Sequence, residues 1–181
     1  ENAKHGRLEF TTEFSEAIKS SDVIFICVGT PEGDDGKAEM KYVYSVAEQI
    51  GKDMNEYKII VNKSTVPVGT AKKVTEIIKE NQSKEIPFEV VSNPEFLREG
   101  RAIRDFTSPD RVVIGAESEK AKSIMKRIYS PMERAENPIM LTNTSSAEII
   151  KYASNAMRAA RISFMNQLAP LCEEVGADVK Q

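Results

Sequence analysis

The sequence has few of the residues that hold metals or disulfides, with two cysteines, one histidine and no tryptophan among 181 residues. Cys27 and Cys172 lie too far apart in the chain to indicate a disulfide framework. A zinc site needs several such ligands, and a Ser-His-Asp triad would have to use His5 in a polar leader. We therefore expect no metal, a reduced cytoplasmic protein, and two cysteines buried in the core.

No apolar run is long enough to cross a membrane, and neither sign of charge dominates. The longest run, Val23–Val28, has six residues, whereas a membrane helix needs about 20. The 25 Lys and Arg against 28 Asp and Glu give a net charge of −3. Nucleic-acid partners usually require a basic surplus, so we expect neither a nucleic-acid nor a membrane partner.

Short β-branched runs alternate with segments of helical periodicity. The predicted strands are 23–28, 58–62, 88–91, 111–115 and 138–141, and the predicted helices between them are 41–52, 70–81 and 118–129. The first strand has no polar alternation, which is typical of a strand covered on both faces. This order predicts an α/β fold, an incomplete Rossmann-like parallel sheet with right-handed crossovers, followed by a long helix.

The long helical pattern continues to Gly176, which provides a C-terminal stop. Ser145 and Glu148 have the spacing of a capping box, with Ser145 as the N-cap residue. Pro170 lies inside the pattern, removes one backbone hydrogen bond, and is expected to kink the helix.

Three predicted strands end in turns of small polar residues and proline, Gly29–Pro31, Ser64–Gly69 and Ser92–Phe96. Ligands of open parallel sheets bind at the carboxyl ends of the strands. Any one of these turns is more typical of an ordinary βα connection. The three together favour a binding edge, although the chain has no G-x-G-x-x-G or P-loop pattern.

Two pairs of polar residues, each four apart, could carry chemistry at that edge. If Pro94 opens a short helix, Glu95 and Glu99 share a face and could divide the roles of general base and hydrogen-bond acceptor. Lys151 and Asn155 in the long helix could stabilise an oxyanion. Taken alone, the acidic pair also fits a solvated face, and the second pair fits an ordinary helix surface.

These motifs resemble the UDP-glucose/GDP-mannose dehydrogenase family. The matching segments follow the family's order over nearly the whole chain and are Val28–Pro31, Lys63–Thr70, Ser92–Gly100, Lys151–Ala156 and Gly176–Val179. A further segment, Pro109–Gly115, looks more like the UDP-glucose 6-dehydrogenase branch than the GDP-mannose branch.

The resemblance implies an NAD-dependent oxidoreductase that converts the C6 alcohol of a nucleotide sugar to a carboxylate through an aldehyde and a cysteine thioester. The residues implied to line the NAD site are Val28, Gly29, Thr30, Pro31, Ser64, Thr65, Val66 and Glu99. The implied catalytic residues are Glu95 as general base, Thr65 near the reacting water, and Lys151 and Asn155 at the oxyanion. The implied substrate contacts are Glu95, Phe96, Leu97, Arg98, Glu99, Lys151 and Asn155.

The family's glycine-rich pyrophosphate turn and its nucleophilic cysteine have no match in this sequence. Glu39, Arg158 and Pro170 also depart from the family pattern. We therefore expect a piece of the enzyme, with 1–143 as the latter part of the NAD-binding domain and 144–181 as a truncated central helix. Such a piece should not turn over sugar nucleotide, and the full-length protein is expected to be a homodimer that makes polysaccharide precursors.

Two alternatives to this function stay open. The substrate could be GDP-mannose or a UDP-N-acetylhexosamine instead of UDP-glucose. The chain could also be a non-catalytic module that binds a nucleotide or a partner.

Overall fold

The computed structural model describes residues 1–133 and 137–180, so residue 181, the last of the predicted second segment, lies outside it. Five strands form one sheet in the order β1-β2-β3-β4-β5. They are β1 (Val23–Ile26), β2 (Lys58–Asn62), β3 (Phe88–Ser92), β4 (Val112–Gly115) and β5 (Ile139–Thr142). The described α-helices are α1 (Phe14–Ser20), α2 (Lys41–Asp53), α3 (Thr70–Asn81), α4 (Ala102–Thr107), α5 (Glu119–Tyr129) and α6 (Thr144–Val175), with one 3₁₀ turn at Ser130–Met132.

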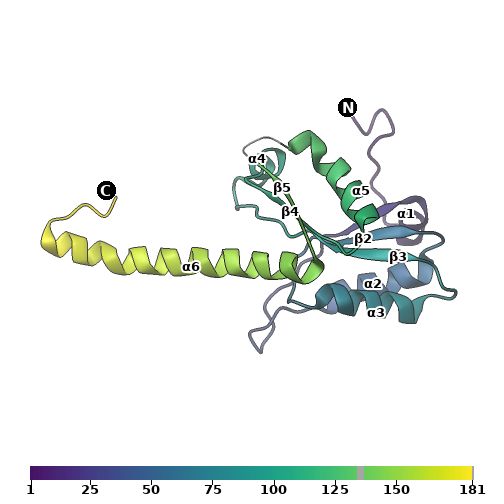
Figure 1. Cartoon of the computed structure of the whole chain (residues 1–181), viewed down its shortest axis with the longest axis horizontal. Helices are drawn as coiled ribbons and strands as arrows, with labels where there is room; N and C mark the ends of the chain where they lie inside the picture. The colour runs from purple at the N-terminus through teal and green to yellow at the C-terminus, as the bar shows by residue number, and fades with distance from the viewer. Residues whose placement is uncertain (134–136, 181) are drawn as a thin grey trace.

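The helices cover both faces of the sheet (Figure 1). Helices α2 and α3 pack on one face, where the apolar periodicity predicted from the sequence places Val43, Ala47 and Ile50 in a fully buried core. Helix α5 packs on the other face through Ala121 and Met125. The predicted α/β architecture, with a mostly parallel sheet and a long terminal helix, is confirmed.

One strand pair departs from the predicted parallel sheet. The pairs β1–β2, β2–β3 and β4–β5 are parallel, but β3 and β4 are antiparallel and meet only at Ser92 and Gly115. A parallel return needs a crossover that carries the chain back to the opposite edge, usually over a full helix. Helix α4 has only six residues, so the connection does not carry the chain back to the amino end of β3, and the last residue of β4 lies beside the last residue of β3.

The prediction that both cysteines are buried is wrong. Strand β1 packs against the core on both faces, with Ile24 and Ile26 on one and Val23 and Phe25 on the other, although as an edge strand it has three of its four residues only partly buried. Cys27 follows the end of this strand and is exposed, and Cys172 is partly exposed on α6. Cys27 lies at the exposed edge of the sheet, and Cys172 lies on the part of α6 that projects from the domain.

Helix α6 joins the domain through its first three turns and then projects away from it (Figure 1). A Cβ added at Gly115 would lie 2.5 Å from the Cβ of Ala147 and 2.6 Å from the carbonyl oxygen of Asn143. Only glycine therefore lets α6 begin against β4. The helix continues as one element through Pro170 and ends at Gly176, whose φ is 75°.

The predicted capping box is wrong. Asn143 is the N-cap residue of α6, and its side chain accepts a hydrogen bond from the Ser146 amide at 2.8 Å. Glu148 is not free to reach back to its own helix start, because its carboxylate binds the first turn of α3. None of the described helices is both long enough and apolar enough to span a bilayer.

Candidate active site at the carboxyl edge of the sheet

Two of the predicted binding turns are fastened to each other by their own hydroxyl groups. Thr30 Oγ1 donates to the carbonyl oxygen of Thr65 at 2.9 Å, and Ser64 Oγ donates to that of Val28 at 2.6 Å. Because β1 and β2 are parallel neighbours, both turns follow the same edge of the sheet.

The residues of these turns differ in what they present to a ligand. Gly29 is exposed, and nothing lies within 4 Å of the point where a Cβ would stand. Pro31 beside it is also exposed. Val66 is 5% exposed and belongs to the core under α2 and α3. Its backbone, and not its side chain, is the part available to a cofactor.

The segment that follows β3 is an irregular loop, so the predicted short helix at 94–99 is wrong. The buried Asn93 side chain holds this loop against the neighbouring elements, donating to the Val113 carbonyl at 2.8 Å and accepting from the Tyr129 hydroxyl at 2.5 Å. The Glu95 carboxylate accepts a hydrogen bond from the Leu97 amide, a local bond that competes with helix formation. Glu99 lies on the exposed turn beyond and shares no helix face with Glu95.

Lys151 meets Glu95 across 56 residues of sequence. Its Nζ donates to the Glu95 carbonyl oxygen at 2.5 Å and lies 3.1 Å from the Glu95 carboxylate. The ammonium also lies 5.4 Å from the ring centroid of Phe96. Lys151 is 6% exposed, so this contact supplies the charge compensation that a buried ammonium requires. Asn155, one turn further along α6, is exposed and does not share this contact.

Lys63 is a site residue that we did not select from the sequence. It follows β2 directly and lines the same pocket as Glu95. Burial lowers the pKa of its ammonium, helped by the like charge of Lys151, while Cys27 and Glu95 act in the opposite direction. Its place at the end of a fully buried strand, just before the Ser64–Gly69 turn, was the signal available in the sequence.

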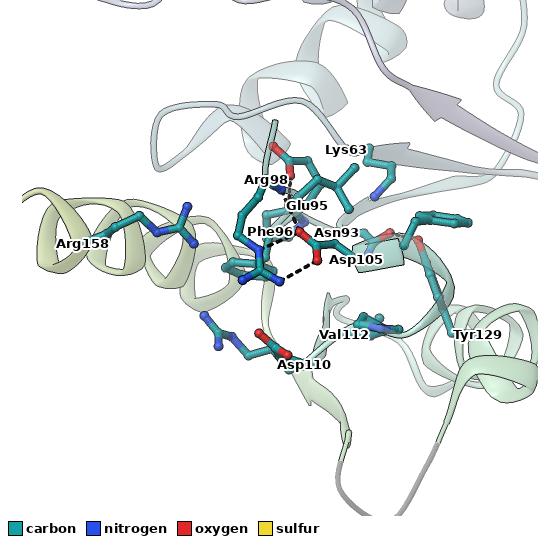
Figure 2. Close-up of a pocket in the computed structure, with 15 residues that line it drawn as sticks. Lys63, Asn93, Glu95, Phe96, Arg98, Asp105, Asp110, Val112, Tyr129 and Arg158 are labelled. Atoms are coloured by element: carbon teal, nitrogen blue, oxygen red, sulfur yellow. Dashed lines mark hydrogen bonds and ion pairs between the residues drawn. The ribbon is translucent and has the colours of Figure 1, made fainter. Parts of the chain in front are cut away.

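A pocket of about 90 Å³ opens beside Glu95, between the loop after β3, the start of β4 and α6 (Figure 2). Arg98 lines it and binds Asp105 through two guanidinium contacts, of 2.6 Å and 2.9 Å. This bidentate pair lowers the pKa of Asp105 to about 2. Arg111 lies with its guanidinium carbon 4.4 Å from the ring centroid of Phe96 and donates to Ser154 Oγ at 3.1 Å.

Glu148 ties the start of α6 to the second binding turn. Its carboxylate accepts from the amides of Gly69 at 2.7 Å and Ala71 at 2.8 Å, and the residue is 2% exposed. Helix N-termini favour such an anion because their first amides have no partner within the helix. Glu148 and Lys151 lie one turn apart on α6, so one short segment holds both the turn that carries Thr65 and the loop that carries Glu95.

Comparison with known proteins shows the family to which the chain belongs. The NAD-binding domain of the UDP-glucose/GDP-mannose dehydrogenase family matches residues 1–133, and the central domain of the same family matches residues 145–181. The chain belongs to this family.

The similar proteins include UDP-glucose and GDP-mannose dehydrogenases. UDP-glucose 6-dehydrogenase TuaD of Bacillus subtilis is 49% identical over 180 residues, which are 99% of this chain and 38% of TuaD. A UDP-glucose dehydrogenase structure from Pyrobaculum islandicum is 39% identical with a TM-score of 0.90, and a GDP-mannose dehydrogenase structure from Pseudomonas aeruginosa is 36% identical with a TM-score of 0.89. Each match covers 98% of this chain and 41% of the solved chain. The chain therefore spans about two fifths of the length of these relatives.

Proposed function

We propose that this chain supplies the NAD-binding edge and part of the catalytic centre of a UDP-glucose 6-dehydrogenase. The observation that carries this proposal is the contact of Lys151 with Glu95 beside the two fastened turns. This contact between Lys151 and Glu95 places a cation and a carboxylate together at the edge of the sheet where dinucleotides bind. The relatives named as UDP-glucose 6-dehydrogenases support UDP-glucose as the substrate over GDP-mannose or a UDP-N-acetylhexosamine.

The first turns are the part of the chain that would hold NAD. The bare Gly29 leaves room for a dinucleotide to approach the backbone, and Pro31 stiffens the same turn. Thr30, Ser64, Thr65 and the backbones of Val28 and Val66 would complete that edge, with Glu99 near the nicotinamide. When bound there, NAD accepts the hydride that leaves C6 of the sugar.

Glu95 and Lys151 would act on the oxygen atoms at C6. The Glu95 side chain is 30% exposed, so water can reach the carboxylate, and we assign it as the base that takes a proton from the attacking water. Lys151 is held by the Glu95 carbonyl oxygen in a buried position. From there its ammonium would stabilise negative charge on the substrate oxygen, with Asn155 as a second donor and Thr65 near the water. The backbone and side chains of 95–99 would contact the sugar.

The proposal extends to the whole protein of which these domains form part. Residues 1–143 would be the latter part of the NAD-binding domain and 144–181 the central helix. The projecting part of α6 exposes large apolar side chains, including Met157 at 62% and Phe164 at 62%, which supports a homodimer formed along this helix. The product of such an enzyme, a nucleotide-linked uronic acid, would serve polysaccharide synthesis in the cytoplasm.

A chimera tests this function directly. Residues 1–181 of this chain replace the matching 38% of TuaD, and NADH formation is followed by absorbance with UDP-glucose, GDP-mannose and UDP-N-acetylglucosamine. We expect turnover of UDP-glucose, and a loss of about 100-fold or more in kcat for the Glu95→Gln variant of the chimera.

A chimera that folds and binds UDP-glucose but forms no NADH would favour the non-catalytic alternative. The 181-residue chain by itself should form none. NADH produced by the pure chain would overturn that expectation.

A further inference from the structure

The charged side chains around the pocket beside Glu95 do not balance. Its lining includes four cations and three carboxylates: Lys63, Arg98, Arg111, Arg158, Glu95, Asp105 and Asp110. Two of the carboxylates already bind a cation, because Asp105 binds Arg98 and Glu95 binds Lys151. Within this lining, Asp110 is the one carboxylate without such a pair, and three cations are left beside it: Lys63, Arg111 and Arg158.

Two of these three cations are arginines presented by neighbouring elements. Arg111 stacks on Phe96, and its guanidinium donates to the neutral hydroxyl of Ser154, so this bond leaves its charge uncompensated. Arg158 lies one turn beyond Ser154 on α6. Figure 2 shows its side chain extending from the helix toward Arg98. In the part of the chain that the structure describes, Arg158 forms no hydrogen bond or ion pair.

The shape of the pocket restricts what could neutralise these arginines. Its volume of about 90 Å³ has room for several water molecules. Pockets for whole drug-sized ligands measure about 300–1,000 Å³. The pocket therefore accommodates a compact group, with the rest of a larger ligand outside it. Guanidinium groups bind phosphate oxygens in a bidentate manner, which makes a phosphate group the matching anion.

We infer that Arg158 and Arg111 form a subsite for the diphosphate of the nucleotide-sugar substrate. This inference rests on the proposed function, since both the substrate and NAD contain a diphosphate. The turns expected to hold NAD follow β1 and β2, whereas this pocket lies beyond β3, beside the carboxylate assigned to the sugar. That placement favours the nucleotide sugar.

Calorimetric titration of the 181-residue chain with inorganic pyrophosphate tests the subsite. We expect saturable binding that weakens by about tenfold in Arg158→Leu, the loss expected for one charged hydrogen-bonded contact. The affinity of Arg158→Lys for pyrophosphate should lie between those of the unmodified chain and Arg158→Leu, because lysine keeps the charge but lacks the guanidinium fork. Arg161→Leu is the matched control, because Arg161 is exposed on the same helix and does not line the pocket. Its affinity should equal that of the unmodified chain.

Competition identifies the source of the diphosphate. UDP-glucose should displace pyrophosphate from the chain, and NAD should not. Absence of binding, equal affinity in Arg158→Leu, an equal loss in Arg161→Leu, or displacement by NAD alone would each overturn the inference. These outcomes are separate from the proposed function, which stands or falls on NADH formation by the TuaD chimera.

Discussion

Replacement of Glu148 by alanine should destabilise the domain more than any surface substitution. The change removes two charge-assisted hydrogen bonds, of 2.7 Å and 2.8 Å, from the first turn of α3. It leaves the buried amide of Ala71 without an acceptor. Hydrogen bonds to charged groups contribute about 1.5–3 kcal/mol each, and loss of a helix cap costs about 0.5–2 kcal/mol. Since the two bonds are themselves the cap, the two figures describe one loss, and we expect about 3 kcal/mol.

Thermal and urea unfolding followed by circular dichroism measure this loss. At roughly 2–4 °C per kcal/mol for a domain of this size, the midpoint should fall by about 6–12 °C. Glu148→Gln keeps one acceptor oxygen without the charge and should cost about half as much. Glu173→Ala is the control, because Glu173 is an exposed glutamate near the far end of the same helix and should change stability by less than about 0.5 kcal/mol. If Glu148→Ala behaved like this control, Glu148 would not hold α6 against α3.

Three further predictions follow from other contacts. Gly115→Ala should cost about 1–3 kcal/mol of unfolding free energy by pushing α6 off β4. Gly29→Ala, where the space around the glycine is open, should unfold like the unmodified chain. Equal unfolding midpoints for the two variants would contradict the close approach of α6 to β4 at Gly115. Lys58→Met should lower the unfolding free energy by about 2 kcal/mol and speed hydrogen exchange in α1. The reason is that the fully buried Lys58 donates to the carbonyls of Lys19 and Ser21 at the end of that helix. Lys52→Met, on the exposed face of α2, should leave both the unfolding free energy and the exchange rate unchanged. The folded-state pKa of Asp105 is lowered from 3.8 to about 2, so its contribution to the unfolding free energy is present above about pH 4 and is lost as the pH falls through 2. In Asp105→Asn, the unfolding free energy should therefore change less with pH over that interval. An unchanged pH dependence in this variant would show that the pair with Arg98 is not its cause.

The elements and the family were predictable from the sequence, because their signals are local. Apolar periodicity fixed α2, α3 and α5, and unbroken β-branched runs fixed β2 and β4. The direction of β4 was not predictable in this way. It depends on where a short connection returns the chain, which periodicity along the chain does not encode.

Candidate site residues that belong to a sequence motif could be predicted, whereas those placed by tertiary packing could not. Glu95 and Lys151 come together as expected, although they are 56 residues apart. The helix expected at Glu95 and Glu99 does not form, because the Glu95 carboxylate binds the Leu97 amide and the buried Asn93 anchors the loop to neighbouring elements. The capping role expected of Glu148 failed for a similar reason, since a tertiary partner, the start of α3, took the carboxylate. Side chains brought in by the fold, such as Asp105 and Arg158, gave no local signal of their position.

A double-mutant cycle in the TuaD chimera tests most directly whether Glu95 and Lys151 act as one catalytic unit. The measured quantity is kcat for NADH formation from UDP-glucose in Glu95→Gln, Lys151→Met and the double variant. Each single change should lower kcat by about 100-fold or more, and the double change should lose no more than about tenfold beyond the worse single variant. Losses that multiply in full would show that the two residues act independently, and unchanged rates in both single variants would contradict the proposed catalytic centre.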